Sequence, residues 1–348
     1  MRILVVSERL SDNDDDGIKN IALAFLREGR RSGHEMSGFS EWTAIPELNI
    51  RLIKTNRWYS DARLKDQVRS INPDMIVYVP WTSATARSLV RLSNLKRFAG
   101  GASTIIVATQ PMPYRWFERL IIPFAKPDLA VVMSPTTEQI LTHQGIRTWF
   151  MPAGYYPERC YPQPDLREQL RERYNLPLDK TIVSHVGHLK RERIAPEFLE
   201  KLNRSRPEWL FLWVGSPHTP AEEDYLLEIE KLPGVRVLRS YIDNIADVYN
   251  LSDVYLFPVA DQFACVGVPL SIIEAAACNR PIVSVPFQGV DKVFEERDGF
   301  AWAHQPQEFV DQVEKCLQIE QVKTGRFVEQ LAWDKLIAAA LEQVHHAN

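Results

Sequence analysis

The sequence predicts an α/β protein built from two doubly wound parallel sheets. Short apolar runs typical of buried strands alternate with segments of helical periodicity along nearly the whole chain. The alternation breaks once, between residues 151 and 177, where prolines and charged residues accumulate. The chain has 348 residues, 45% of them apolar, which is enough for two domains with full cores.

These features predict the following domain organisation. An N-terminal domain covers residues 1–160, and a C-terminal helix at 331–346 packs back on it. A linker at 161–177 leads to a C-terminal domain at 178–330. The two similar α/β domains are expected to face each other across a cleft.

Composition excludes several classes of protein. The net charge of −4 argues against a nucleic-acid-binding protein. The four cysteines contain no CxxC pair, so their spacing fits neither a zinc site nor a disulfide framework. The N-terminus lacks the features of a signal peptide, and no segment reaches the ~20 apolar residues that span a bilayer. We expect a cytoplasmic, soluble protein, and peripheral contact with the inner membrane face stays open.

The N-terminal half begins with a strand at 2–6, a polar loop at 7–16 and a helix from Gly17 to Glu35. This start resembles half of a nucleotide-binding fold but lacks GxGxxG. The acidic residues Asp14–Asp16 would repel a phosphate, so a neutral or cationic ligand fits better here. A solvated turn with an aspartate helix cap is at least as good an interpretation.

Strands and helices then continue to alternate. Strands are expected at 50–53, 74–79, 104–108 and 129–133, and helices at 62–71, 85–98 and 136–143. Ligands of such sheets lie beyond the carboxyl ends of the strands. The loops at 7–17, 80–83 and 109–113 would therefore line one wall of a cleft, with Trp81 and Gln110 among their residues.

The segment at 114–126 mixes aromatic residues with Arg115, Arg119 and Lys126. It could rest on a membrane surface or hold a lipid-linked substrate. A helix packed on the sheet is the favoured interpretation. Pro123 predicts that any helix here is short or kinked.

The C-terminal half repeats the alternation. Strands are expected at 181–186, 210–214, 235–238, 254–257 and 282–285, and helices at 166–175, 195–202, 221–231, 245–251, 309–317 and 331–344. The strand at 181–186 runs into the charged loop Gly187-His188-Leu189-Lys190-Arg191-Glu192-Arg193.

The stretch VGVPLSIIEAAACNRP at 266–281 indicates a loop and a helix after the strand at 254–257. Pro269 suits the first turn, and Asn279 and Pro281 end the helix. The unpaired N–H groups at such a helix start favour a phosphate. Glu274, just over one turn in, could accept hydrogen bonds from ribose hydroxyls. A plain strand–helix unit with Glu274 in solvent explains the spacing equally well.

Several of these segments, in order, resemble the GT-B glycosyltransferases, specifically the large retaining family 4. The start MRILVVSE…GIKNIALAFLREGRRSGHE is similar to that family's first strand, glycine-bearing loop and helix. MPAGYYPERCYP is similar to its linker, VGHLKRER to its GRLxxxKG loop and LSDVYLFP to its ADVFVLPS strand. VGVPLSIIEAAACNRPIVS is similar to its EGLPLSLLEAMACGKPVVA segment, and DGFAW to its NGFL turn. Trp333 lies where the family's crossing C-terminal helix often begins.

The resemblance implies two Rossmann-like domains and a nucleotide-sugar donor held mostly by the C-terminal one. Glu274 matches the second glutamate of the EX7E motif, which binds ribose. Gly267, Val268, Pro269 and Leu270 would present backbone N–H groups to the diphosphate, and Gly17 matches a loop glycine that approaches the donor phosphate. Arg193 matches a phosphate-neutralising lysine and His188 an arginine, with Gly187, Lys190 and Arg191 in the same loop. No metal and no cofactor are implied beyond the nucleotide-sugar co-substrate.

The sequence departs from the family pattern at four positions. Val266 replaces the first EX7E glutamate, and Asp261, five residues earlier, is a candidate substitute. The usual histidine after the fourth strand is absent from Tyr78-Val79-Pro80-Trp81, and Gln110 occupies the other frequent histidine position. His188 in place of arginine weakens the phosphate clamp at neutral pH unless the site keeps the imidazole protonated.

The resemblance therefore predicts a metal-independent retaining glycosyltransferase that acts in glycan or glycolipid synthesis. Its acceptor, a sugar, a lipid-linked molecule or a small molecule, would bind on the side of Trp81 and Gln110. Two alternatives stay open: a nucleotide-sugar-binding protein with little transfer activity, which the departures favour, and a GT-B epimerase.

Overall fold

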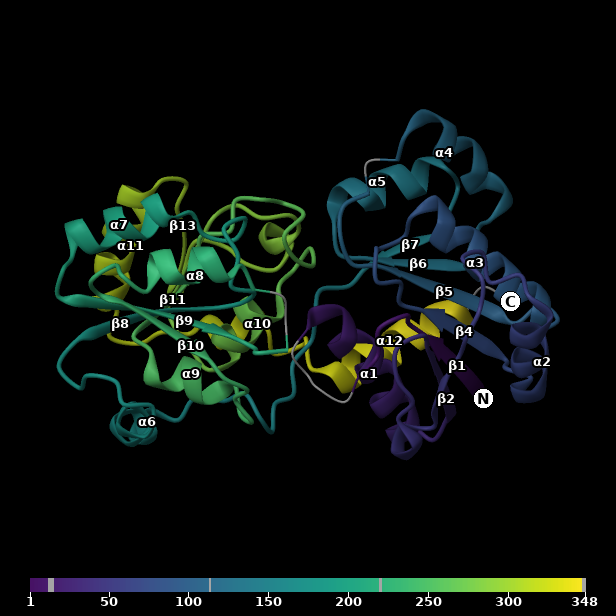
Figure 1. Ribbon diagram of the computed structural model, residues 1–348, viewed down its shortest axis with the longest axis horizontal. Helices are drawn as coiled ribbons and strands as arrows, with labels where there is room; N and C mark the ends of the chain where they lie inside the picture. The colour runs from purple at the N-terminus through teal and green to yellow at the C-terminus, as the bar shows by residue number, and fades with distance from the viewer. Residues whose placement is uncertain (12–15, 113, 219–220, 346–348) are drawn as a thin grey trace. The chain divides into compact units, whose positions relative to one another are not determined.

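The computed structural model describes residues 1–11, 16–112, 114–218 and 221–345, and it divides into two compact units (Figure 1). The N-terminal unit comprises Met1–Ala153, Cys265–Gly267 and Trp333–Asn348. The C-terminal unit comprises Gly154–Ala264 and Val268–Ala332. The division falls after Ala153, so the segment expected as a linker, 161–177, belongs to the C-terminal unit. Its charged part forms helix α6 there.

The N-terminal unit is built on a seven-stranded parallel sheet of order β3-β2-β1-β4-β5-β6-β7. The strands are β1 (Arg2–Val6), β2 (Glu35–Ser40), β3 (Ile50–Leu52), β4 (Met75–Tyr78), β5 (Ser103–Ala108), β6 (Leu129–Val132) and β7 (Thr148–Phe150). The helices are α1 (Gly17–Arg31), α2 (Ala62–Ile71), α3 (Ala86–Phe98), α4 (Trp116–Ile121), α5 (Pro135–His143) and α12 (Trp333–His345). The predicted break at Pro123 appears as a short 3₁₀ turn, Ile122–Phe124, that follows α4.

Helix α1 begins where the sequence predicts but ends earlier. The Asp16 carboxylate accepts the backbone N–H of Ile18 at 2.9 Å and so caps the helix start. The predicted end at Glu35 is wrong, because the helix stops at Arg31 and Gly33 adopts a left-handed φ of 81°. Glu35 instead opens β2, which pairs with β1. Asp14 and Asp15 lie outside the described residues.

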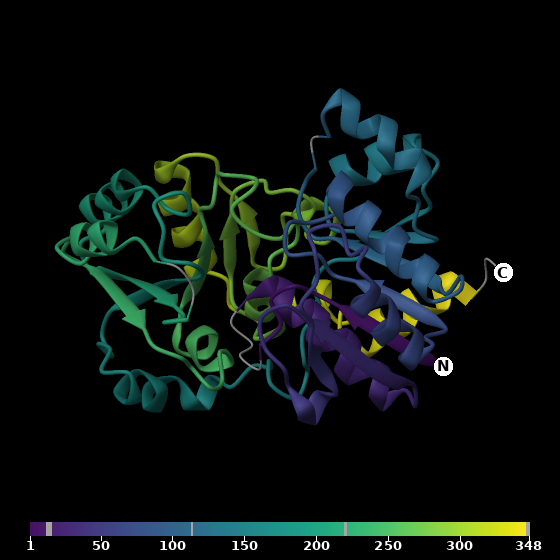
Figure 2. The same cartoon turned by 45° about the vertical axis from the view of Figure 1, so that its right-hand side comes forward.

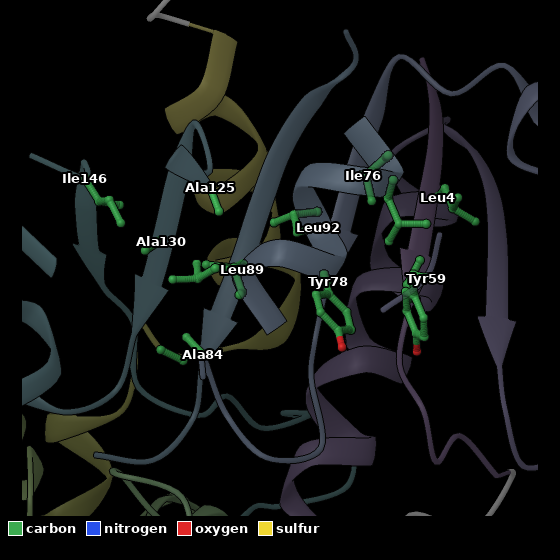
Figure 3. Packing of buried hydrophobic residues seen from close by; sticks show 14 of the residues in the cluster. Leu4, Tyr59, Ile76, Tyr78, Ala84, Leu89, Leu92, Ala125, Ala130 and Ile146 are labelled. Carbon is green, nitrogen blue, oxygen red and sulfur yellow. The ribbon is translucent and has the colours of Figure 1, made fainter. Parts of the chain in front are cut away.

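Side-chain alternation in the strands buries the N-terminal sheet on both faces. Leu4 and Val6 of β1 belong to a large apolar cluster with residues of β4, α2 and α3, part of which Figure 3 shows. Ile3 and Val5 are equally buried but point to the opposite face. Helix α12 contacts α1, β5 and β6, and Figure 2 shows it beside the N-terminal strands. Near-continuous apolar strands of this kind are typical of parallel sheets covered on both sides.

The C-terminal unit contains a six-stranded parallel sheet of order β10-β9-β8-β11-β12-β13. The strands are β8 (Thr181–Val186), β9 (Trp209–Gly215), β10 (Val235–Arg239), β11 (Val254–Phe257), β12 (Ile282–Ser284) and β13 (Phe300–Trp302). The helices are α6 (Arg167–Arg173), α7 (Pro196–Ser205), α8 (Glu223–Ile229), α9 (Ala246–Leu251), α10 (Leu270–Ala277) and α11 (Pro306–Leu317). The expected α/β fold with two Rossmann-like sheets is thus confirmed.

Both sheets share one topological feature that bears on function. In each, the chain builds outward in one direction and then returns to build in the other. The order therefore reverses between β1 and β4 in the N-terminal unit and between β8 and β11 in the C-terminal unit. Doubly wound sheets bind ligands beyond the carboxyl ends of the strands at such a switch point. Among the described residues, no helix combines the length and apolar character needed to cross a bilayer.

Candidate functional site

The switch point of the C-terminal unit lies between neighbouring strands β8 and β11. The charged turn from Gly187 to Arg193 follows β8, and the loop that leads to α10 follows β11. Because both strands run in the same direction, these two segments leave the sheet at the same edge. Most of the residues that the sequence assigns to donor binding lie on them.

Arg193 is the most unusual side chain at this edge. The residue is only 8% exposed, and within the described part of the chain its Nε has no hydrogen-bond partner. No carboxylate among the described residues forms an ion pair with it. A Cβ atom added to Gly187 would lie 3.0 Å from an Arg193 terminal nitrogen, so a larger residue there would crowd the guanidinium. A buried guanidinium without a counter-ion is costly, and binding an anion would offset that cost.

His185 lies near Arg193, because a Cβ atom added to Gly187 would be 3.0 Å from a side-chain nitrogen of each. The sequence analysis did not identify this histidine. Its Nδ1–H donates to the Leu256 carbonyl at 2.9 Å, and its buried Nε2 has no partner among the described residues. Burial, together with the nearby charge of Arg193, lowers the pKa of His185 to about 3 against the opposing hydrogen bond to Leu256. The imidazole is therefore neutral at physiological pH. A histidine in the buried strand TIVSHV was the only signal in the sequence.

The other cationic residues of the turn have different surroundings. Lys190 lies 3.3 Å from a carboxylate oxygen of Glu192. The Arg191 guanidinium pairs with Glu228 and lies 5.0 Å from the centre of the Tyr225 ring. His188 is half-buried, and its carbonyl accepts the Lys190 N–H. The structure thus separates Arg191, which is engaged at the surface, from the buried Arg193.

Helix α10 starts at Leu270 as the sequence predicts, and Pro269 is its N-cap residue. No side chain caps this end, while the Ile272 N–H donates back to the Pro269 carbonyl at 3.2 Å. Val268 is fully buried. The Gly267 N–H, expected to contact a phosphate, donates instead to the Thr109 carbonyl at 2.7 Å, and both residues belong to the N-terminal unit.

Glu274 is half-buried on α10, and a buried tyrosine orients it. The Tyr249 hydroxyl donates to Glu274 Oε2 at 2.8 Å. Burial, followed by the Glu274 charge, raises the pKa of Tyr249 well above its ordinary value, so this hydroxyl keeps its proton. Sequence reasoning did not find Tyr249, because α9 shows no pattern that connects it to α10.

The structure also shows the surroundings of Asp261 and of Val266, which stands at the position of the first EX7E glutamate. Asp261 is exposed, and its Oδ1 accepts the Phe263 N–H at 2.9 Å, so its carboxylate caps a local turn. Val266 is buried, and a Cβ atom added to Gly17 would lie 3.3 Å from its Cγ1. In this structure, therefore, an apolar side chain packs against Gly17 where the family pattern has a carboxylate.

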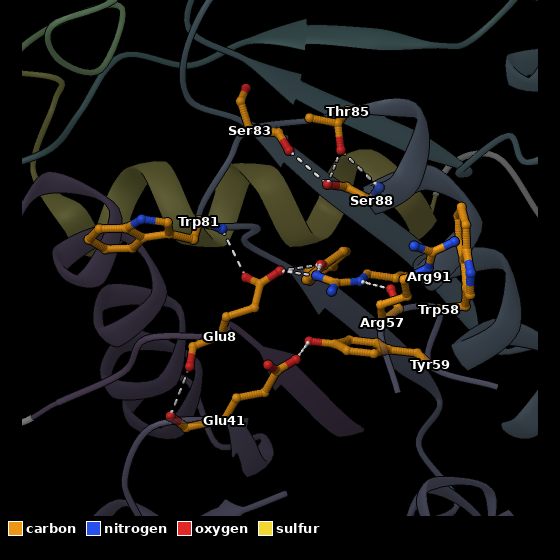
Figure 4. Close-up of polar contacts among 12 residues, drawn as sticks. Glu8, Glu41, Arg57, Trp58, Tyr59, Trp81, Ser83, Thr85, Ser88 and Arg91 are labelled. Carbon is orange, nitrogen blue, oxygen red and sulfur yellow. Dashed lines mark hydrogen bonds and ion pairs between the residues drawn. The ribbon is translucent and has the colours of Figure 1, made fainter. Parts of the chain in front are cut away.

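The switch point of the N-terminal unit holds a paired carboxylate (Figure 4). Glu8 Oε1 accepts hydrogen bonds from the Tyr78 hydroxyl and Arg91, both at 2.6 Å. Glu8 Oε2 accepts the Trp81 backbone N–H at 2.8 Å. Gln110 lies on the next loop, where its carbonyl accepts the Ser83 hydroxyl at 2.9 Å. The two predicted acceptor-side residues therefore lie on loops at the carboxyl edge of this sheet.

The described residues contain no group of three or more histidine, cysteine or carboxylate side chains arranged to hold a metal ion. Asp14 and Asp15, which the sequence raises as a candidate acidic pair, lie outside those residues. Among the cationic residues of the turn, Arg193 is the buried one.

Residues 180–318 match the model of the protein family "Glycosyl transferases group 1". A putative teichuronic acid biosynthesis glycosyltransferase, TuaC, of Bacillus subtilis is 24% identical over 152 residues. An alpha-galactosylglucosyldiacylglycerol synthase of Streptococcus pneumoniae is 26% identical over 164 residues. The matches cover 43% and 44% of this chain but only 36% and 42% of the relatives' lengths.

Solved structures match over the full length of the chain. Anabaena HepE, in complex with UDP and glucose, has a TM-score of 0.77 at 14% identity, with complete coverage of both chains. A sucrose-phosphate synthase from Thermosynechococcus elongatus has a TM-score of 0.79 at 14% identity, again with complete coverage. These findings confirm the GT-B fold and the predicted resemblance to group 1 glycosyltransferases. The assignment to family 4 stays a prediction.

Proposed function

We propose that this protein is a retaining glycosyltransferase that moves a sugar from a nucleotide-diphosphate donor to a hydroxyl acceptor. The reaction would serve glycan or glycolipid synthesis. The observation that carries the proposal is the buried guanidinium of Arg193, which has no counter-ion among the described residues. It lies at the switch point of the C-terminal sheet, within the segment that matches the glycosyltransferase family.

Each part of the donor has a proposed contact in the C-terminal unit. Arg193 binds the diphosphate, with the uncapped start of α10 adding its dipole and N–H groups. Glu274, oriented by Tyr249, accepts hydrogen bonds from the ribose hydroxyls. As the bond to the sugar breaks, negative charge grows on the leaving diphosphate. A fixed guanidinium in a poorly solvated place stabilises that charge in the transition state.

The named relatives suggest which donors to test first. HepE was solved with UDP, and the two curated relatives are named for teichuronic acid and glycolipid synthesis. We therefore propose a uridine nucleotide as donor. Either a glycan or a lipid-linked sugar would be the acceptor.

Calorimetric titration with UDP, GDP and ADP tests the donor site. The wild-type protein should bind at least one of the three, and Arg193→Met should weaken that binding about tenfold or more through the lost charged contact. Arg206→Ala is the matched control, because Arg206 precedes β9 and so lies at the opposite edge of the same sheet. Absence of binding by all three nucleotides would refute the proposal, as would equal affinity in the Arg193 variant.

One observation favours the alternative of a binding protein with little transfer activity. Val266 places a buried apolar side chain where a carboxylate is expected to contact the donor sugar. Release of free nucleotide from UDP-sugars, measured with and without acceptors, separates the two functions. Acceptor-dependent release supports transfer, and tight donor binding without any release supports the alternative. Isomerisation of the sugar without an acceptor would instead indicate an epimerase.

We also propose that transfer needs no metal ion and no further cofactor, since Arg193 supplies positive charge at the diphosphate. The wild-type rate should survive treatment with EDTA and full removal of divalent cations. A rate that falls to background and recovers on addition of Mg²⁺ or Mn²⁺ would contradict this part of the proposal.

The segment from Arg115 to Phe124 suits peripheral contact with an anionic membrane. Trp116 and Phe124 are 77% and 87% exposed, Leu120 is also exposed, and the exposed Arg115 and Arg119 accompany them. Exposed aromatic residues beside cations match the interface of a bilayer that contains acidic lipids. We propose that this surface brings the enzyme to a lipid-linked acceptor.

Co-sedimentation with vesicles tests this contact. Wild-type protein should bind phosphatidylglycerol vesicles more strongly than phosphatidylcholine vesicles, and Phe124→Ser should reduce that binding. Leu227→Ser on α8 removes an exposed apolar side chain from the other unit and should have no effect. Equal loss in both variants, or no binding by the wild type, would refute the contact.

A further inference from the structure

We infer that the N-terminal unit carries a subsite for an acidic saccharide, formed by Arg9, Trp42 and Trp81. This inference rests on the proposed transfer function and specifies the chemical class of its acceptor. The ligand is a sugar that bears a carboxylate or a phosphate next to an apolar face of its ring. We call the three residues the Arg9 platform.

The platform is a cation flanked by two indole rings. The guanidinium carbon of Arg9 lies 4.8 Å from the centre of the Trp81 ring and 5.8 Å from that of Trp42. Arg9 follows β1, Trp42 follows β2 and Trp81 follows β4, so all three leave the carboxyl edge of the sheet around its switch point. Parallel sheets bind their ligands at this edge.

The platform is open to a ligand. Trp42 is 56% exposed, Arg9 is exposed and Trp81 is partly exposed. Burying an indole face against the C–H face of a sugar removes apolar surface from water, and so a large exposed tryptophan at a sheet edge is a reason to expect a ligand. Indole rings also keep Arg9 in place by cation–π attraction.

The positive charge of Arg9 selects an anion, in contrast to the neutral or cationic ligand that the acidic residues Asp14–Asp16 lead us to expect. Of these, Asp16 caps helix α1, and Asp14 and Asp15 lie outside the described residues. Among the described residues, no carboxylate forms an ion pair or hydrogen bond with Arg9. The two acidic residues next to the platform in the sequence are already engaged: Glu8 pairs with Arg91 at 2.6 Å, and Glu41 accepts the Tyr59 hydroxyl at 2.6 Å. The Nζ of Lys19 also lies near the platform, 5.4 Å from the centre of the Trp42 ring. Arginine binds carboxylates and phosphates through paired N–H donors.

Hydrogen bonds fix the backbone at both tryptophans before any ligand arrives. The backbone N–H of Trp81 donates to Glu8 Oε2 at 2.8 Å, as Figure 4 shows. The backbone N–H of Trp42 donates to the Ser40 hydroxyl at 3.1 Å. The Glu41 N–H also donates to the Glu8 carbonyl at 3.0 Å, which ties the loop after β2 to the loop after β1. A prepared surface of this kind loses little conformational entropy when a ligand binds.

Ligand-observed NMR titration with three small probes tests the platform without any transfer reaction. The probes are methyl β-glucuronide, glucose 6-phosphate and methyl β-glucoside, so two are acidic and one is neutral. Wild-type protein should bind both acidic probes more tightly than the neutral one. Arg9→Ala should abolish that preference, with a loss of about tenfold for the acidic probes. Trp42→Ala should weaken binding of all three.

Arg57→Ala is the matched control. Arg57 lies 5.0 Å from the centre of the Trp58 ring, and Figure 4 shows Trp58 and Trp81 at opposite ends of the network around Glu8. This variant removes the same charge from another cation–indole pair of the same unit and should bind all three probes as the wild type does. Thermal unfolding of each variant checks that the fold is intact.

The outcomes separate this inference from the transfer function. Equal affinity for the three probes, no binding of either acidic probe, or an unchanged preference in Arg9→Ala would overturn the platform. If UDP still binds through Arg193 in that case, the donor site stands and only the acceptor class is wrong. Binding of the acidic probes without binding of any nucleotide would instead support the platform and refute the transfer function.

Discussion

The switch points of the two sheets have the same topology but opposite electrostatics. In the N-terminal unit, Glu8 is nearly buried and has three donors: Arg91, the Tyr78 hydroxyl and the Trp81 N–H. In the C-terminal unit, Arg193 is nearly buried and has no counter-ion among the described residues. A satisfied network fixes the loops that carry it, whereas an unsatisfied charge stores a cost that a ligand can remove. The comparison teaches that the buried charge of Glu8 organises the loops of its switch point, whereas the buried charge of Arg193 is left to bind an anion.

The largest expected effect comes from removing the paired carboxylate. Glu8→Ala leaves the Arg91 guanidinium, whose side chain is 12% exposed, without its counter-ion. It also leaves the Tyr78 hydroxyl and the Trp81 backbone N–H without their acceptor. We expect the free energy of unfolding to fall by about 3–5 kcal/mol, which urea denaturation measures. Glu41→Ala, which removes one acceptor from Tyr59, should cost only about 1 kcal/mol. Equal losses in the two variants would show that the hydrogen bonds and ion pair of Glu8 stabilise the fold no more than the single bond of Glu41 does.

Arg193→Met should produce the opposite pattern. Replacing an unpaired buried charge by an apolar side chain of similar length should leave the free energy of unfolding unchanged or raise it. Sugar transfer should nevertheless fall by roughly 10²–10³-fold, since a fixed donor to the leaving group is lost. Denaturation and steady-state kinetics on the same preparation measure both. A large loss of stability with normal transfer would show that Arg193 stabilises the fold and does not contact the donor.

The neutral, buried His185 near Arg193 predicts a pH dependence of stability. Because the folded-state pKa of about 3 lies below the usual value of 6.5, the unfolded chain binds a proton between these values and the folded chain does not. Wild-type stability therefore falls as pH drops below about 6.5. His185→Asn lacks this titration but keeps a donor for Leu256. We expect the variant to have a lower free energy of unfolding than the wild type at neutral pH. This difference should shrink by about 2 kcal/mol between about pH 7 and about pH 5.

Urea denaturation of the wild type and His185→Asn at the two pH values measures this difference. A constant difference would mean that His185 titrates alike in the folded and unfolded states, and that its surroundings are better solvated than its burial implies.

A smaller effect should come from the residue that orients Glu274. Tyr249→Phe removes one hydrogen bond to the Glu274 carboxylate, and we expect the donor to bind about fivefold more weakly, which corresponds to about 1 kcal/mol. UDP should lose affinity, whereas inorganic pyrophosphate, which lacks a ribose, should not. Equal losses for both ligands, measured by calorimetry, would contradict a role for this pair at the ribose.

The smallest effect is expected at Arg191. Its guanidinium pairs with Glu228 and lies over Tyr225 at the surface, where solvent screens an ion pair and makes it weak. Arg191→Ala should change donor affinity less than about threefold. If calorimetry finds a loss as large as that of Arg193→Met, both cations contact the donor and the contrast between them disappears.

The sequence by itself determined the strand–helix alternation, the two parallel sheets and the segment that resembles group 1 glycosyltransferases. Apolar periodicity, proline at helix starts and the motif around Glu274 are local features, and local features are visible along a chain. It did not predict β2, whose EMSGFS pattern is polar, nor the three-residue strands β7 and β13, because their pairing partners rather than their own residues stabilise them.

Only the tertiary structure distinguished Arg193 from Arg191. The two residues are neighbours in one charged turn, and nothing in their spacing shows which of them is buried. The same holds for Tyr249 and Glu274, which come from different helices, and for Arg9, Trp42 and Trp81, which follow three different strands. Burial, partners and the solvation of charge depend on which segments meet in space, and for these residues that is decided by the order of strands in the sheet.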